Sequence, residues 1–245
     1  MNHHTVAAIS IAGSCLDVLG SLYLAYDLLG GQHGPLRILT RGVTYGIIYG
    51  VGYGLGLGSF FGLMSGIAFG FTAAIEVNRV ARGKPPYTLP WQALFSVLRG
   101  IAYGIGLHRQ VGATFAALFG ALIAAGQVVG YSRGISPTMD YVAARRPRLT
   151  RRQFWSTIVR TFGYCTAALI CGAFVHHVDW TLAIRIGLVT GLITGLIQTI
   201  SPYIEYYADH MPARWLGVFG IGLILVGFAL QSLQYWVALF DIHLS

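Results

Sequence analysis

Eight stretches of about 20 mostly apolar residues follow one another along this chain, and they constrain its fold more than any other feature. A helix that crosses the hydrocarbon core of a bilayer needs about 20 such residues. The pattern therefore predicts an all-α polytopic membrane protein with about eight transmembrane helices. The predicted spans are 6–29, 38–57, 59–77, 91–107, 110–131, 154–175, 181–205 and 214–240.

The scarcity of charge supports a membrane location. Charged residues make up 10% of the 245 residues and hydrophobic residues 55%, whereas a typical soluble domain is about 25% charged. The net charge of +8 does not indicate a nucleic-acid partner, because the basic residues lie between apolar stretches and form no separate basic patch. We therefore expect the lipid bilayer as the main partner and no nucleic acid. No nucleotide-binding loop or cysteine pair with metal-site spacing occurs, so we expect no cofactor.

The distribution of basic residues predicts the orientation. Lysine and arginine favour the cytoplasmic side of a membrane. Twelve of them flank the segments after the first, third, fifth and seventh spans, whereas the opposite side holds little beyond Arg109. The twelve are Arg37, Arg41, Arg79, Arg82, Lys84, Arg133, Arg145, Arg146, Arg148, Arg151, Arg152 and Arg214. We therefore predict a single domain over 1–245 in the cytoplasmic (inner) membrane, with both termini outside and no soluble domain.

One segment has an unusual density of glycine. Residues 41–58 read RGVTYGIIYGVGYGLGLG, with glycine at every fourth position from Gly42 to Gly58. Small residues four apart form a smooth helix face that allows close helix packing in a bilayer. The segment is therefore predicted to be a membrane helix that packs through GxxxG-type contacts, with a stripe of tyrosines beside the glycines.

The opening of this segment recurs twice. RGVTYG at 41–46 is matched by RGIAYG at 99–104 and RTFGYC at 160–165. Each copy opens a predicted helix that is followed by a second, glycine-bearing helix. The sequence thus predicts three in-line helical-hairpin repeats, at approximately 38–77, 91–131 and 154–205. The spans at 6–29 and 214–240 flank the repeats and are the candidates for a fourth, split copy.

Asp17 is the first candidate for a functional residue. It lies about 11 residues into the first predicted span, or about 16 Å along the helix. An ionisable side chain near the bilayer centre is costly and is a hypothesis for a functional site. We expect it to face the bundle, toward Arg99 or Arg160. The alternative is a neutral or ion-paired structural carboxyl group.

The repeat predicts further pathway residues, because it places arginine and tyrosine at equivalent positions and glutamine in the return helices. They are Arg41, Arg99, Arg160, Tyr45, Tyr103, Tyr164, Gln127 and Gln198. Arginine suits bidentate contacts with phosphate or carboxylate, so a cavity lined by these residues would attract a small anion or an anionic lipid. In the alternative interpretation, the arginines extend to the interface and pair with Asp27, Glu76 and Glu205, while the glutamines only link helices.

Histidine gives a weaker alternative site. His108, His176 and His177 fall on the predicted outer side, where a metal site would need them to converge. No HxxxH spacing supports such a site, so solvated loop histidines are the simpler interpretation. The chain also has no GxSxG or Walker motif, and an enzymatic role is therefore not favoured.

Two functions fit these observations. The first is a small transporter or channel with a pathway lined by repeat-related Arg, Tyr, Thr and Gln, for an anionic or phosphate-bearing solute. The second is a non-catalytic membrane subunit or scaffold that binds partner helices or lipid through its Gly and Tyr faces, as a homo- or hetero-oligomer. A pathway requires the polar stripe to line an interior space, and a scaffold requires the glycine stripes to face outward.

The predicted orientation has a direct test. Cysteines introduced as Asn2→Cys and His243→Cys should both react with a membrane-impermeant maleimide in intact cells, because both termini are expected outside. The parent chain, whose own cysteines lie inside apolar stretches, is the control. Protection of both introduced cysteines until the cells are lysed would contradict the orientation.

Overall fold

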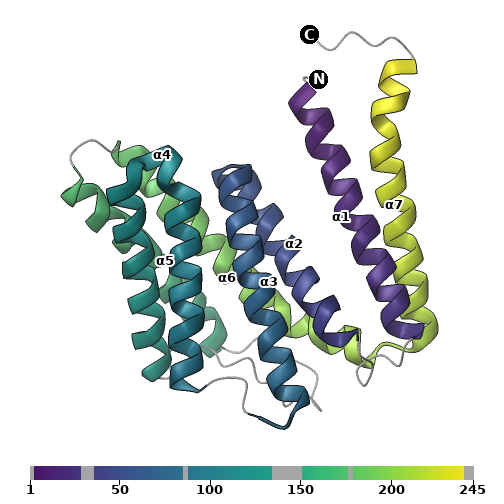
Figure 1. Cartoon of the computed structure of the whole chain (residues 1–245), viewed down its shortest axis with the longest axis horizontal. Helices are drawn as coiled ribbons and strands as arrows, with labels where there is room; N and C mark the ends of the chain where they lie inside the picture. The colour runs from purple at the N-terminus through teal and green to yellow at the C-terminus, as the bar shows by residue number, and fades with distance from the viewer. Residues whose placement is uncertain (1–2, 29–35, 85–87, 134–150, 176–178, 240–245) are drawn as a thin grey trace. The chain divides into compact units, whose positions relative to one another are not determined.

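The computed structural model describes residues 3–28, 36–84, 88–133, 151–175 and 179–239, and within these ranges it contains helices and no strand (Figure 1). The helices are α1 (His3–Leu28), α2 (Arg37–Leu57), α3 (Ser59–Ala81), α4 (Leu89–Ser132), α5 (Arg151–Phe174), α6 (Trp180–His210) and α7 (Ala213–Leu239). All of them except α2 are long and apolar enough to cross a membrane. α2 is less apolar because glycine, tyrosine and arginine occupy much of its length.

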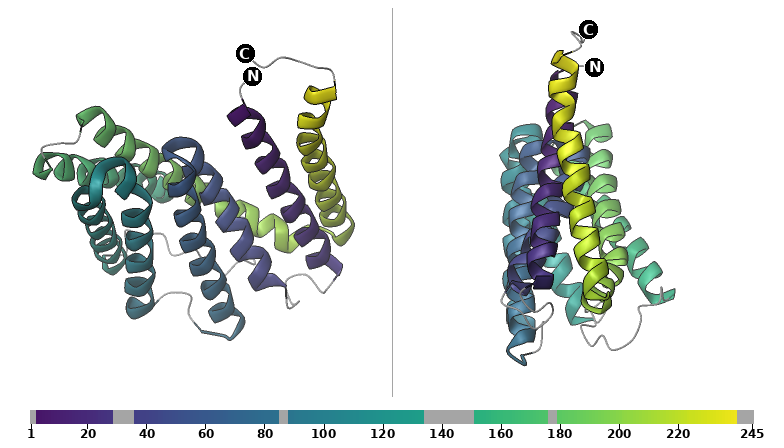
Figure 2. Two further views of the ribbon diagram at one scale, coloured as in Figure 1. Left: turned by 45° about the horizontal axis from the view of Figure 1, so that its top comes forward. Right: turned by 90° about the vertical axis from the view of Figure 1, so that its right-hand side faces the viewer.

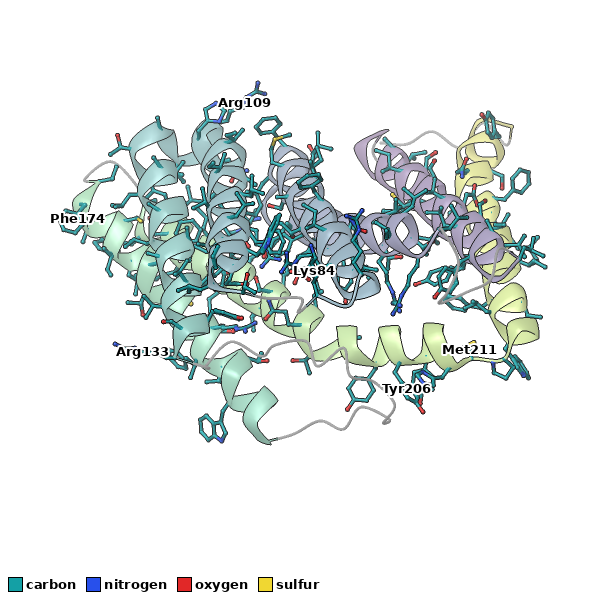
Figure 3. All side chains as sticks on the ribbon, turned by 60° about the horizontal axis from the view of Figure 1, so that its bottom comes forward. Lys84, Arg109, Arg133, Phe174, Tyr206 and Met211 are labelled. Atoms are coloured by element: carbon teal, nitrogen blue, oxygen red, sulfur yellow. The ribbon has the colours of Figure 1, made fainter. Side chains whose placement is uncertain are left out.

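The 44-residue helix α4 is not straight. Gly112 has a φ of 78° and a ψ of 163°, which interrupts the helix. In a straight helix Gly100 and Gly120 would lie about 30 Å apart, yet a Cβ built on Gly100 would be only 2.5 Å from the carbonyl oxygen of Gly120. α4 therefore folds back on itself, as a first arm (89–111) and a second arm (113–132). Figure 3 shows Arg109 beside this turn and Arg133 at the far end of the second arm.

The chain divides into two compact units, residues 1–44 with 208–245 (unit 1) and residues 45–207 (unit 2). In unit 1, α1 lies alongside α7 (Figures 1 and 2). A Cβ on Gly13 would be 2.5 Å from the carbonyl oxygen of Gly227, and one on Gly20 would be 2.5 Å from that of Gly220. The two helices are therefore antiparallel and are in backbone contact along their length.

Unit 2 contains three further antiparallel contacts of this kind. Between α2 and α3, a Cβ on Gly66 would lie 2.6 Å from the carbonyl oxygen of Gly46. The two arms of α4 meet at Gly100 and Gly120. Between α5 and α6, a Cβ on Gly187 would lie 2.7 Å from the Cα of Cys165. Since real Cβ contacts are hardly ever shorter than 3.0 Å, these backbones come closer than any larger residue at these glycines would allow.

The core of unit 2 is rich in aromatic rings. Tyr49 stacks on Phe69 with ring centroids 3.7 Å apart, and Tyr53 and Tyr103 meet edge to face at 5.9 Å. Both Tyr53 and Tyr103 are fully buried. The core therefore combines glycine contacts within each hairpin with aromatic packing both within and between hairpins.

Pro202 lies inside α6, which is helical from Trp180 to His210 although proline removes a backbone hydrogen bond. Helices in membranes tolerate proline when neighbouring groups satisfy the freed carbonyl groups.

The turn in α4 generates a stability prediction. A φ of 78° with a ψ of 163° is a conformation that only glycine adopts readily, and a Cβ at Gly112 would meet nothing within 4 Å. Gly112→Ala should therefore destabilise the protein by about 1–3 kcal/mol through backbone strain alone, and thermal unfolding in detergent should show a lower melting temperature. Gly222→Ala is the matched control, because that glycine is helical and has equally open space. Equal effects of the two changes would show that α4 has no strained turn.

Candidate functional site

Unit 2 contains a cavity of about 220 Å³ that is bounded by both arms of α4, by α5 and by α6. Its polar lining consists of two guanidinium groups, three carboxamides and two hydroxyls, and no acidic residue is among the lining residues that the structure describes. The polar residues are Arg99, Arg160, Gln92, Gln127, Gln198, Tyr164 and Thr194. The remaining lining is apolar or glycine, namely Leu122, Ile123, Val159, Gly126, Gly130 and Gly163.

Helical periodicity explains which residues of each helix line the cavity. Residues three, four or seven apart lie on one face of a helix. Gln92 and Arg99 are seven apart on the first arm of α4, and Thr194 and Gln198 are four apart on α6. The second arm of α4 contributes residues from 122 to 130 in the same periodicity, and α5 contributes residues 159–164. One stripe from each of four helical segments therefore forms the cavity wall.

Arg99 is held in place by three groups from α3. Its Nη2 lies 3.5 Å from Glu76 Oε1 and donates a hydrogen bond of 3.0 Å to Thr72 Oγ1. Its guanidinium also lies 4.7 Å above the ring centroid of Phe69. Because the Arg99 side chain is 13% exposed and that of Glu76 only 2%, the ion pair forms largely out of solvent. The Arg99 side chain is thus fixed at the cavity wall. Glu76, which is not among the lining residues, neutralises part of its positive charge.

The carboxamides leave hydrogen-bonding capacity in the cavity wall. Gln127 Nε2 donates to the hydroxyl of Tyr164 at 3.1 Å. The Oε1 atoms of Gln127 and Gln198 are buried and have no hydrogen-bond partner among the described residues. A buried polar atom without a partner costs about 1–3 kcal/mol. Because these two oxygens are buried, they lie within the cavity wall rather than at its surface.

Behind this wall, hydroxyl groups form a directed chain. Thr194 donates to the carbonyl oxygen of Thr190 at 2.6 Å, so its oxygen accepts from Tyr53 at 2.6 Å, and Tyr53 in turn accepts from Tyr103 at 2.8 Å. The direction follows because each hydroxyl has only one proton to donate. This chain links α2, α4 and α6 and fixes the Thr194 hydroxyl at the cavity.

The structure brings together five of the residues that the sequence singles out. Arg99, Arg160, Tyr164, Gln127 and Gln198 all line the cavity. Their functional role is not established by this placement and stays a prediction.

The other predicted residues lie elsewhere. Tyr45 and Tyr103 are buried in the aromatic core of unit 2 and do not line the cavity. Arg41 is buried and belongs to the part of α2 in unit 1. The side chain of His108 is exposed, and no group of residues suited to a metal ion occurs in the described part of the chain. His176 and His177 lie outside the described residues.

Asp17 has a partner that the sequence does not predict. Its Oδ2 accepts a hydrogen bond from Nε2 of Gln231 on α7, and its Oδ1 packs against Gly227. Asp17 belongs to unit 1 and Arg99 to unit 2, and each has a partner within its own unit. Asp17 therefore contributes a polar link between α1 and α7. The side chains of Asp27 and Glu205 are not among those described.

Several residues of the site were missed by sequence reasoning. Gln92 precedes Arg99 by two helical turns, and this spacing is a signal that could have found it. The link between Arg99 and Glu76 was expected only as one of several possible pairings. Gly126, Gly130 and Gly163 gave no usable signal, because nothing distinguishes them in sequence from glycines that pack against a neighbouring helix.

Comparisons of the chain with protein-family models, with curated proteins and with solved structures find no match. The function is therefore argued from the geometry of the cavity.

The Arg99–Glu76 pair generates a prediction that does not depend on function. Glu76→Gln should destabilise the protein by about 3–5 kcal/mol, because it leaves a guanidinium without its carboxylate in a buried site. The double change with Arg99→Gln should cost less than the sum of the two single changes. Thermal unfolding of the purified variants in detergent measures the coupling. Strictly additive losses would show that the pair contributes nothing.

Proposed function

We propose that this chain is a small integral membrane transporter or channel that binds an anionic or phosphate-bearing solute in the cavity of unit 2. The observation that supports it is the lining: two arginines and three carboxamides face one space in which no described lining residue is acidic. Guanidinium groups bind phosphate and carboxylate through paired hydrogen bonds. An anion is therefore the ligand that best matches this site.

The location of the cavity supports passage rather than catalysis. Its walls come from α4, α5 and α6, all of which are long and apolar enough to cross a membrane. Charged side chains inside membrane helices are costly, and they usually face a cavity or a bundle interior that serves a transport pathway. The described lining also contains no Asp, Glu, His, Cys or Lys, so the hydroxyl groups of Tyr164 and Thr194 have none of these general bases beside them in the lining.

The alternative is a membrane subunit or scaffold that binds partner helices or lipid through its glycine and tyrosine faces. The glycine contacts argue against it, because Gly66, Gly100 and Gly187 already pack against the backbone of their own hairpins. Tyr45, Tyr49 and Tyr53 are likewise buried within the chain. These faces are thus occupied, and the polar residues are the ones that surround a space.

The proposal is tested with sn-glycerol 3-phosphate as a probe. Purified protein in a neutral maltoside detergent should bind it, as measured by isothermal titration, and Arg160→Gln should weaken the binding at least tenfold. Arg109→Gln removes the same charge from an exposed position outside the cavity and should leave the affinity within about twofold.

The outcomes separate the alternatives. Equal weakening by Arg160→Gln and Arg109→Gln would indicate attraction to the overall positive charge and would contradict the site. Specific binding without uptake of the labelled probe into proteoliposomes would contradict transport and favour an anion-binding subunit.

A further inference from the structure

We propose that the ligand of this cavity is a membrane amphiphile whose phosphate head group carries a net negative charge, and that it reaches the arginines sideways between the second arm of α4 and α5. This inference rests on the proposed function, because it names the ligand class of the same cavity. It follows from the position of the cavity mouth, from the glycines that border it and from the depth of Arg160.

The cavity reaches the flank of two helices. Gly126 on the second arm of α4 and Gly163 on α5 line it, and both are exposed. Val159, which also lines it, is 50% exposed. Both helices qualify as membrane spans, and Gly126 and Gly163 lie within the qualifying segments Leu89–Ser132 and Thr157–Phe174. The flank of such a helix faces lipid, so the mouth opens toward the bilayer.

Three glycines keep this mouth open. A Cβ built on Gly126, Gly130 or Gly163 would meet no atom within 4 Å. The glycines inside the hairpins behave in the opposite way, since a Cβ on Gly100 would be 2.5 Å from a backbone oxygen. Gly126, Gly130 and Gly163 therefore do not bring helices together. They leave a gap between α4 and α5 where larger side chains would otherwise project.

The depth of the positive charge suits a lipid head group. Arg160 lies near the end of the apolar segment Thr157–Phe174 that is closer to the start of α5 at Arg151. Polar head groups occupy the layer directly outside the roughly 30 Å hydrocarbon core. A phosphate at that boundary is therefore within reach of the Arg160 guanidinium, given the length of an arginine side chain.

The lining combines two kinds of surface. Leu122, Ile123 and Val159 supply apolar surface, whereas the arginines and glutamines supply hydrogen bonds. A volume of about 220 Å³ is below the range of about 300–1,000 Å³ that drug-sized ligands occupy. It accommodates a head group while the acyl chains remain in the bilayer. A free anion would gain nothing from the apolar surface, whereas an amphiphile uses both kinds of surface.

The test compares three probes in a neutral maltoside detergent. These are dihexanoyl phosphatidic acid, dihexanoyl phosphatidylcholine with the same chains and a zwitterionic head group of zero net charge, and sn-glycerol 3-phosphate with no chains. Phosphatidic acid should bind at least tenfold more tightly than either of the others. Gly163→Leu fills the mouth and should weaken phosphatidic acid binding at least tenfold, and Gly126→Leu, in the facing helix, should do the same. Gly222→Leu, in equally open space on α7, should bind like the wild type.

The failures of the two proposals are distinguishable. If glycerol 3-phosphate binds as tightly as phosphatidic acid and both leucine variants bind normally, the lateral route is wrong and the cavity remains a site for a soluble anion. If phosphatidylcholine binds as tightly as phosphatidic acid, the head-group charge is not recognised and this inference is wrong. If no phosphate probe binds, or if Arg160→Gln has no effect on any of them, the proposed function fails as well.

Discussion

Backbone contact between small residues is the constraint on which this structure depends. Inside a bilayer the hydrophobic effect does not drive helices together, so close packing must do so. In each of the three hairpins of unit 2, the two helical segments contact each other at one such pair. The pairs are Gly46 with Gly66, Gly104 with Ala116, and Cys165 with Gly187. Each first-named residue lies five positions after Arg41, Arg99 or Arg160 in the recurring motif. The superposition of the hairpins stays a prediction, but the motif marks a helix contact in each of them.

The cavity arises where such contacts are missing. Glycine serves two opposite purposes in this chain, because its lack of a side chain either lets two backbones meet or leaves room beside a helix. Gly100 illustrates the first and Gly163 the second. The contact within the α4 hairpin holds Arg99 on its first arm and Gln127 on its second at one cavity. α5 closes the opposite side only in part, since Gly163 and Gly126 leave a gap.

The sequence predicted an all-helical fold with membrane-spanning helices and singled out five of the residues that line the cavity, and the physical reasons can be named. Apolar stretches set the helices, and the break expected between 107 and 110 occurs at Gly112. The repeated arginines and glutamines were candidates because polar groups in apolar helices need partners. The pairing of helices was harder, because periodicity shows which residues share a face but not what the face meets. Glu76 beside Arg99 and Gln231 beside Asp17 depend on such pairing.

The most direct measurement is a cryo-electron microscopy reconstruction of the protein in a nanodisc that contains phosphatidic acid. We predict head-group density between the guanidinium groups of Arg99 and Arg160, with phosphate oxygens about 2.7–2.9 Å from their nitrogens. The acyl chains should leave the cavity past Gly126 and Gly163 into the bilayer. A cavity that is filled by the protein's own side chains, or one with an opening to water alone, would contradict the account.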